Sequence, residues 1–227
     1  GLGDVYKRQE GIERIRLGSL EPGIITEEFV QSIAALPKMC PHFHLSLQSG
    51  CDTTLERMNR RYRSAEYAEK CGLLRKYLGN PALTTDVIVG FPMETEEDFQ
   101  ASYDFVESIH FYETHIFKYS RRHGTKAAAM SGQLTEAQKA ARSDKMLALN
   151  EQHAKEYEKS VLGSELKVLL EEEVEINGEQ WYIGHSMEYI KTAVKRQDNY
   201  GVNDIVTVKA EKFLEEHTLT GEVLGSE

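Results

Sequence analysis

The sequence predicts an α/β fold in which a parallel β/α architecture is followed by a small all-β barrel. In the first half of the chain, strand patterns alternate with amphipathic helix patterns at intervals of roughly 30 to 40 residues, the size of a strand with its crossover helix. Beyond Gly163 the pattern changes to five short strands in about 65 residues without a helix, which is typical of a small barrel.

Four strand-then-helix units make up the first half. The third is the clearest, because the apolar run 87–89 stops at Gly90 and Thr95 forms a capping box with Asp98. Since residues past the carboxyl ends of parallel strands face the ligand in such folds, we expect a site near Asp86 and Gly90. The strand patterns cover residues 13–20, 42–50, 84–90 and 114–120, and helices are expected to begin near Thr26, Asp52, Ser64 and Thr95.

A long polar helix is predicted between the two halves. Thr135 and Gln138 make a capping box at its start, and the pattern continues to about Ser160. In the second half, Asn177-Gly178 predicts a hairpin turn between the first two strands. The strand patterns begin near Leu166, Trp181, Ile190, Asp204 and Gly221. The expected divisions are a non-native tail at 1–9, the α/β part at 10–134, the connecting helix at 135–160 and the barrel at 161–227.

The composition excludes some classes of function. The net charge of −10 argues against nonspecific binding of polyanions by the whole surface, so a nucleic-acid role has to rest on local basic patches. No apolar run is long enough for a membrane span and no secretory signal pattern is present, so we expect a cytoplasmic protein without a membrane partner. Cys40, Cys51 and Cys71 are too widely spaced for a disulfide framework or a metal-ligand motif, which favours free thiols.

The first nine residues, GLGDVYKRQ, have no hydrophobic period and do not lead into the pattern that follows. They resemble a translated sequencing-adapter tail, and we leave them out of the fold prediction. We therefore expect the natural chain to start further upstream.

Five strings together resemble a known family. They are RIRLGSLEP, HFHLSLQSGCD, ALTTDVIVGFP, HIFKYSRRHGT and GHSMEYIKTAV. In this order and spacing they resemble the tRNA methylthiotransferases of the radical S-adenosylmethionine (SAM) superfamily, most closely the branch that acts on threonylcarbamoyladenosine beside the anticodon. The resemblance implies a partial (β/α) barrel of the radical SAM type, with its first strands missing, followed by a TRAM barrel that binds RNA. The implied partner is the tRNA anticodon stem-loop, and no DNA partner is expected.

The resemblance also implies cofactors. In that family SAM and two 4Fe-4S clusters replace an adenine C–H bond with a methylthio group, and one cluster is held by a Cys-x-x-x-Cys-x-x-Cys triplet. This sequence does not contain the triplet. We therefore expect a fragment whose cluster ligands lie elsewhere and which is inactive alone, and we assign no catalytic residue and no metal ligand in it.

Residues at strand ends are the candidates for SAM binding by resemblance. Carboxylate, amide and hydroxyl groups there suit an ammonium group or ribose hydroxyls, although caps and turns need the same residue types. Two positions depart from the family pattern, since Met93 stands where a Gly is usual and His123 where a Pro is usual. The cofactor-binding candidates are Ser19, Glu21, Gln48, Ser49, Asp86, Gly90 and Tyr119.

Basic and aromatic residues are the candidates for RNA binding. Lys and Arg meet phosphates, and aromatic rings stack on bases, although some of these rings equally suit a barrel core. The segment from Ser160 onward is acidic, with six Lys or Arg against fourteen Asp or Glu, so binding has to use one face. The RNA-binding candidates are Arg121, Arg122, Tyr189, Lys191, Lys195 and Arg196, and Trp181, Tyr182 and Tyr200 are open to either reading.

Two alternatives remain at this point. The sister branch that acts on isopentenyladenosine shares most of the strings, although SLEP and KYSRR favour the threonylcarbamoyladenosine branch. The second alternative belongs to another functional class: the chain is a non-catalytic RNA-binding fragment. In that case the barrel segment carries the affinity for RNA.

Overall fold

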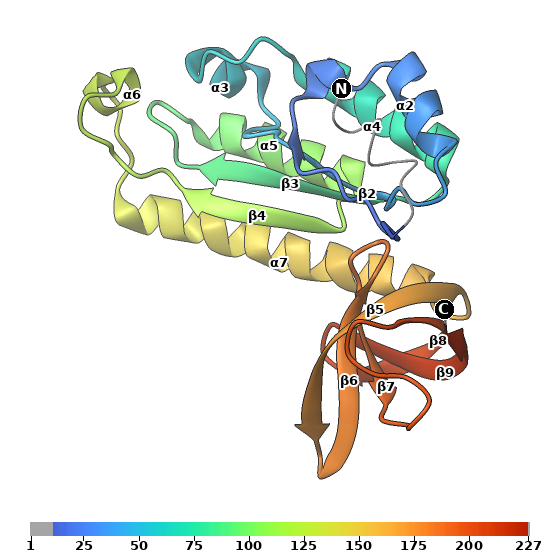
Figure 1. Cartoon of the computed structure of the whole chain (residues 1–227). Helices are drawn as coiled ribbons and strands as arrows, with labels where there is room; N and C mark the ends of the chain where they lie inside the picture. The colour runs from blue at the N-terminus through green and yellow to red at the C-terminus, as the bar shows by residue number, and fades with distance from the viewer. Residues whose placement is uncertain (1–10, 227) are drawn as a thin grey trace. The chain divides into compact units, whose positions relative to one another are not determined.

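The computed structural model describes residues 11–226, which form two compact units (Figure 1). One unit contains residues 16–37 and 43–153, and the other contains residues 38–42 and 154–226 together with the described residues before 16. The predicted tail at 1–9 lies outside the described residues. We describe each unit by itself.

The first unit is built on a parallel sheet in the order β1-β2-β3-β4. The strands are β1 (Ser19–Leu20), β2 (His42–Leu45), β3 (Ala82–Val89) and β4 (Glu113–Lys118). The register places Asp86 of β3 beside His115 of β4. This arrangement confirms the predicted parallel α/β architecture.

Helices cover one face of this sheet, with α4 and α5 behind it in Figure 1. Tyr67 of α4 is fully buried, and its hydroxyl donates to the Leu45 carbonyl of β2 at 2.8 Å. Thr95 and Asp98 form the predicted capping box of α5. The helices are η1 (Pro22–Ile24), α2 (Glu27–Ala34), α3 (Asp52–Arg57), α4 (Ser64–Leu78), α5 (Glu96–Ile109), α6 (Lys126–Ala129) and α7 (Glu136–Ser160).

Two local predictions differ from the structure. The strand expected at 13–20 is reduced to β1, because Ile15 forms only an isolated parallel bridge to Met39. The Arg14 side chain donates to the carbonyls of His185 at 2.8 Å and Lys167 at 2.6 Å within the second unit. Asp52 is the first residue of α3 rather than its N-cap, and its carboxylate accepts the backbone N–H of Ser64 at 2.7 Å. That side chain therefore joins the two helices that follow β2.

The second unit contains a closed barrel in the order β5-β6-β7-β9-β8, as predicted. Asn177 and Gly178 take positive φ angles of 53° and 80°, which is the geometry of a type I′ hairpin turn between β5 and β6. A second turn at His217 begins the last strand earlier than predicted. The strands are β5 (Glu165–Ile176), β6 (Glu179–Ser186), β7 (Lys191–Lys195), β8 (Ile205–Glu215) and β9 (Thr218–Ser226).

Two glycines allow the barrel to close. Gly184 lies beside a register shift of β5, where an added Cβ would be 1.7 Å from the Leu169 carbonyl oxygen. Gly221 lies beside a shift of β8, where a Cβ would be 1.7 Å from the Lys209 carbonyl oxygen. At both β-bulges the neighbouring backbone fills the space that a side chain needs.

The start of α7 carries the predicted capping box, because Thr135 and Gln138 bond each other's backbone N–H groups at 3.0 and 3.2 Å. Within the first unit, Asn150 of α7 accepts the Thr114 N–H of β4 at 2.6 Å, which places the helix along this edge of the sheet. None of the described helices has the length and apolar character that crossing a membrane requires.

Candidate functional site

A cavity of about 440 Å³ opens where the carboxyl ends of β2, β3 and β4 meet. Its position is the one that parallel α/β folds use for ligands. The lining combines apolar side chains with a carboxylate, an amide, a phenol and two cations. The lining residues are Gln48, Asp86, Ile88, Phe117, Lys118, Tyr119, Ser120, Arg122, Thr125 and Ala127.

Gln48 is held in a left-handed backbone conformation, with φ of 71°. Its N–H donates to the Asp86 carbonyl at 2.8 Å, and its own carbonyl accepts the Ile88 N–H at 2.9 Å. Non-glycine residues in this conformation are held there by surrounding structure and are common at functional sites. Here β3 fixes the backbone of Gln48, and its side chain lines the cavity.

Tyr119 supplies a hydroxyl that is buried and has no hydrogen-bond partner among the described residues. Its ring packs edge-on against Phe91 with 5.2 Å between centroids, and Lys139 Nζ lies 5.6 Å from the ring centre. Buried polar atoms are nearly always paired, so an unpaired phenol in a cavity wall is available to a ligand.

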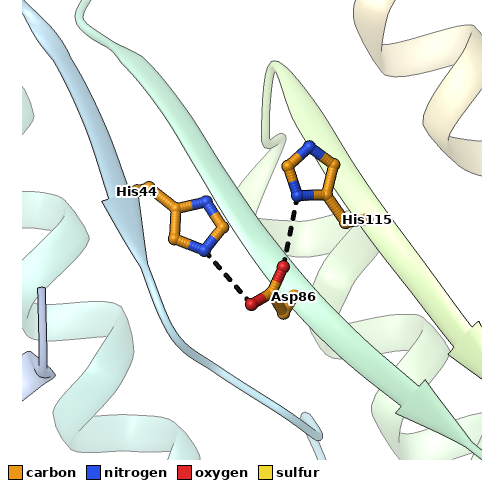
Figure 2. A group of neighbouring side chains, drawn as sticks. All are labelled: His44, Asp86 and His115. Atoms are coloured by element: carbon orange, nitrogen blue, oxygen red, sulfur yellow. Dashed lines mark hydrogen bonds and ion pairs between the residues drawn. The ribbon is translucent and has the colours of Figure 1, made fainter. Parts of the chain in front are cut away.

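The Asp86 carboxylate lies between two histidines on the open face of the sheet (Figure 2). His44 Nε2 is 3.3 Å from Asp86 Oδ2, and His115 Nδ1 is 3.2 Å from Asp86 Oδ1. The three side chains come from three neighbouring strands. Neither histidine was a sequence candidate, although His44 alternates onto the same strand face as Gln48 and that pattern offered the means of finding it.

Four other SAM-binding candidates do not line this cavity. The Ser49 side chain is fully buried, and its hydroxyl accepts the Cys51 N–H at 3.2 Å. Gly90 is buried, and an added Cβ would be 2.5 Å from Lys139 Cγ. Ser19 and Glu21 are exposed near the end of β1. The roles of these four residues stay predictions.

Comparison with known proteins shows what this chain is similar to. Residues 4–106 match the model of the Radical SAM superfamily. The chain is 38% identical over 209 residues to threonylcarbamoyladenosine tRNA methylthiotransferase MtaB of Bacillus subtilis, which covers 92% of this chain and 46% of the relative. The chain is therefore similar to radical SAM tRNA methylthiotransferases along most of its length. It spans about half the length of the curated relatives it matches.

Further relatives include a second MtaB and an enzyme named for another tRNA substrate. MtaB of Thermotoga maritima is 35% identical over 193 residues, covering 82% of this chain and 42% of the relative. The tRNA-2-methylthio-N(6)-dimethylallyladenosine synthase of Corynebacterium jeikeium is 40% identical over 162 residues, covering 71% and 32%. Coproporphyrinogen III oxidase (HemN) of Escherichia coli matches with a TM-score of 0.53 at 12% identity, covering 86% of this chain and 46% of that one, and supports the fold.

The three cysteines of this chain do not fit a 4Fe-4S cluster of the kind that the radical SAM resemblance implies. Cys40, Cys51 and Cys71 are buried and form no disulfide with one another, and only Cys71 lies in a helix, α4. Burial raises the pKa of the Cys71 thiol to about 12, so this thiol stays protonated, whereas cluster ligation requires thiolates. The Cys51 thiol lies 3.4 Å from Asp98 Oδ1 at the start of α5.

The basic residues predicted to contact RNA differ in their surroundings. Arg122 lines the cavity, whereas the Arg121 Nε donates to the Ala128 carbonyl at 2.8 Å. In the barrel, Lys195 pairs with Glu179 at 2.8 Å and Arg196 with Glu173 at 2.7 Å. These acidic partners reduce the positive charge that the barrel offers to phosphates.

The aromatic RNA-binding candidates of the barrel differ in how exposed they are. Tyr189 is 39% exposed, but its ring stacks on His185 with 4.4 Å between centroids. Lys191 is exposed at the start of β7. Trp181, Tyr182 and Tyr200 are at most 7% exposed, which favours the core reading for these three rings.

Proposed function

We propose that this chain provides the cosubstrate-binding part of a radical SAM enzyme that methylthiolates threonylcarbamoyladenosine in tRNA. The observation that carries the proposal is the similarity to the Bacillus subtilis relative across 92% of this chain, a protein whose name states this activity. The cavity at the strand ends supports it, because it offers donors and acceptors where the fold binds ligands.

The chain's own residues suit SAM in chemical type. The Gln48 amide offers a donor and an acceptor, the Asp86 carboxylate accepts from ammonium or ribose hydroxyl groups, and the Tyr119 hydroxyl donates. When bound beside a reduced cluster, SAM supplies the 5′-deoxyadenosyl radical of the family reaction. The role of these three residues is to bind and orient the cosubstrate in a partly apolar cavity.

The cluster itself has no ligands here, because the three buried thiols do not fit it. We therefore propose that the 227-residue chain is inactive alone and binds SAM without cleaving it. The tRNA partner is proposed to be the anticodon stem-loop, contacted through Arg122 near the cavity and through exposed Lys191 on the barrel.

A chimaeric enzyme tests this function. This chain replaces the matching segment of the Bacillus subtilis relative in a strain without that relative, and tRNA nucleosides are measured by mass spectrometry. We expect 2-methylthio-threonylcarbamoyladenosine to appear. Gln48→Ala in the same chimaera is expected to abolish it, with Gln197→Ala on the barrel as the matched control.

Two results favour other functions. Accumulation of 2-methylthio-dimethylallyladenosine instead indicates the sister activity, which the 40% identity to the Corynebacterium jeikeium synthase supports. No modified nucleoside, with tRNA binding by the isolated chain that is lost without residues 163–227, indicates a non-catalytic RNA-binding function. No modification and no tRNA binding contradicts all three proposals.

A further inference from the structure

The open face of the parallel sheet carries a group of three metal-ligating side chains, of which the proposed cosubstrate site uses only Asp86. His44, Asp86 and His115 each offer one ligand atom, and these atoms all lie within 4.8 Å of one another. Figure 2 shows the two imidazole rings turned toward the carboxylate from opposite sides. The β3–β4 register places Asp86 beside His115, and His44 comes from β2, the strand on the other side of β3.

Two donor separations, one to each oxygen of the Asp86 carboxylate, are suited to a metal site, and the two histidine donor atoms lie within 4.8 Å of each other. His44 Nε2 and Asp86 Oδ2 are 3.3 Å apart, and His115 Nδ1 and Asp86 Oδ1 are 3.2 Å apart. A tetrahedral zinc ion with bonds of about 2.0 to 2.2 Å places neighbouring donors about 3.3 Å apart. Two imidazoles and a carboxylate are also a preferred ligand set for divalent first-row metals.

The outer nitrogen of each ring also has an oxygen partner. His44 Nδ1 lies 3.0 Å from the hydroxyl oxygen of Thr84, which is buried. His115 Nε2 lies 3.6 Å from Glu113 Oε1, which is an ion-pair distance rather than a hydrogen bond. Histidines that bind metals generally donate their second N–H to such an oxygen, which fixes the ring and leaves the inner nitrogen free for the metal.

Charge and exposure favour a cation at this point. Among the described residues Asp86 makes ion pairs with the two histidines and with no Lys or Arg, so its negative charge is not neutralised by a fixed cation. The His115 side chain is 45% exposed, which gives an ion access to the group. Three protein ligands leave a fourth position open toward solvent, as in catalytic rather than structural zinc sites.

We propose that His44 Nε2, His115 Nδ1 and the Asp86 carboxylate form a binding site for Zn²⁺, with Thr84 and Glu113 as supporting partners. The site shares Asp86 with the proposed cosubstrate contacts, but its test measures metal binding alone and so does not depend on the methylthiotransferase proposal. It revises the sequence-based expectation that this chain holds no metal ligands. Since Asp86 also lines the cavity, the bound ion would lie at the cavity's edge.

The experiment uses the full chain after treatment with a chelator. Equilibrium dialysis with Zn²⁺ measures stoichiometry and affinity, and Co²⁺ in place of Zn²⁺ reports the coordination through its visible absorption. We expect one ion per chain. His115→Gln and His44→Gln are each expected to weaken binding at least tenfold, and Thr84→Val is expected to weaken it about 10- to 100-fold.

His123→Gln is the matched control, because His123 is exposed in a loop outside the group. Thermal melting of each variant separates lost ligation from lost folding, and exposed His115 makes the His115→Gln variant the decisive one. Failure of the wild-type chain to bind either ion at millimolar concentration overturns the proposal. Binding that survives both His44→Gln and His115→Gln overturns it as well, since the ion then lies elsewhere.

Discussion

Glu94, in the loop after β3, and Arg142 of α7 form a buried ion pair with 2.5 Å between Oε1 and Nη1. Their side chains are only 2% and 7% exposed. The Glu94 carboxylate also accepts the Gly90 N–H at 2.9 Å, so the pair holds the loop at the end of the central strand. Burial raises the pKa of the Glu94 carboxyl, while the Gly90 N–H and Arg142 oppose that shift.

Removing one partner of this pair is expected to be costly. Arg142→Met leaves the Glu94 carboxylate buried without its cation, and we expect the free energy of unfolding to fall by about 3 to 5 kcal/mol. The matched control is Lys145→Met on the same helix, whose exposed pair with Glu96 at 3.4 Å should be worth less than about 1 kcal/mol. Urea denaturation measures both. Equal losses would show that burial of the pair is unimportant.

Met93 occupies a left-handed conformation, with φ of 65°, at the position where the related family usually has Gly. The backbone is held there because its N–H donates to the Gly132 carbonyl at 2.8 Å and its carbonyl accepts from Arg57 at 3.0 Å. A non-glycine residue in this region carries a penalty of about 1 to 2 kcal/mol. The Met93 side chain does not narrow the cavity, because it is 49% exposed and does not line it.

Met93→Gly is therefore expected to stabilise the fold. Relief of the left-handed strain exceeds the added flexibility of glycine, and we expect a gain of about 1 kcal/mol in the free energy of unfolding. Met93→Ala is the control, since it removes the same exposed side chain but keeps the strained conformation. If both variants show the same change in urea denaturation, the backbone explanation is wrong.

Local sequence patterns predicted much of the fold. The Thr95 and Thr135 capping boxes and the Asn177-Gly178 turn were found because each depends on residues close together in the chain. The closing glycines were not recognised, since the role of Gly184 depends on the approach of the Leu169 carbonyl from another strand. Pairing partners of this kind are set by register and are invisible to a local pattern.

The candidate site was only partly predicted, because some of its residues meet only through the register of neighbouring strands. Gln48, Asp86 and Tyr119 follow strand patterns, and the structure brings them around one cavity. Asp86 and His115 are 29 residues apart in the chain and meet only through the β3–β4 register. Ser49 has the same sequence context as Gln48 but faces the interior, because neighbouring residues at a strand end point to opposite sides.

The bulge glycines provide a test of barrel closure. Gly184→Ala and Gly221→Ala each place a Cβ against a carbonyl oxygen that is part of the backbone and cannot move aside alone. We expect each to lower the free energy of unfolding by about 3 kcal/mol or more. Gly201→Ala is the control, because nothing lies within 4 Å of its added Cβ.

The fluorescence of Trp181, the only tryptophan, reports barrel unfolding directly because the residue is 7% exposed. The two bulge variants should lose more free energy of unfolding than Gly201→Ala. If they do not, the structural role of the bulges is contradicted.

Tyr62 gives a prediction for alkaline pH. Its hydroxyl donates to the carbonyls of Ser46 at 2.9 Å and Leu47 at 2.7 Å, and burial raises its pKa from 10.0 to about 12. Between pH 10 and 12 the unfolded chain therefore loses this proton while the folded chain keeps it, so stability falls as pH rises. The stabilisation that Tyr62 contributes is present in full below pH 10. Above pH 10 it falls by at most about 1.4 kcal/mol per pH unit.

Tyr62→Phe removes this contribution together with the two hydrogen bonds. The variant is expected to be less stable than the wild type at pH 9, and the difference between them should shrink by about 1 kcal/mol on going to pH 11. Tyr67 and Cys71 also have raised pKa values, so both proteins still lose stability with pH and only the difference is diagnostic. Urea denaturation at the two pH values measures it. A difference that stays constant would mean that Tyr62 ionises equally readily in the folded and unfolded chains.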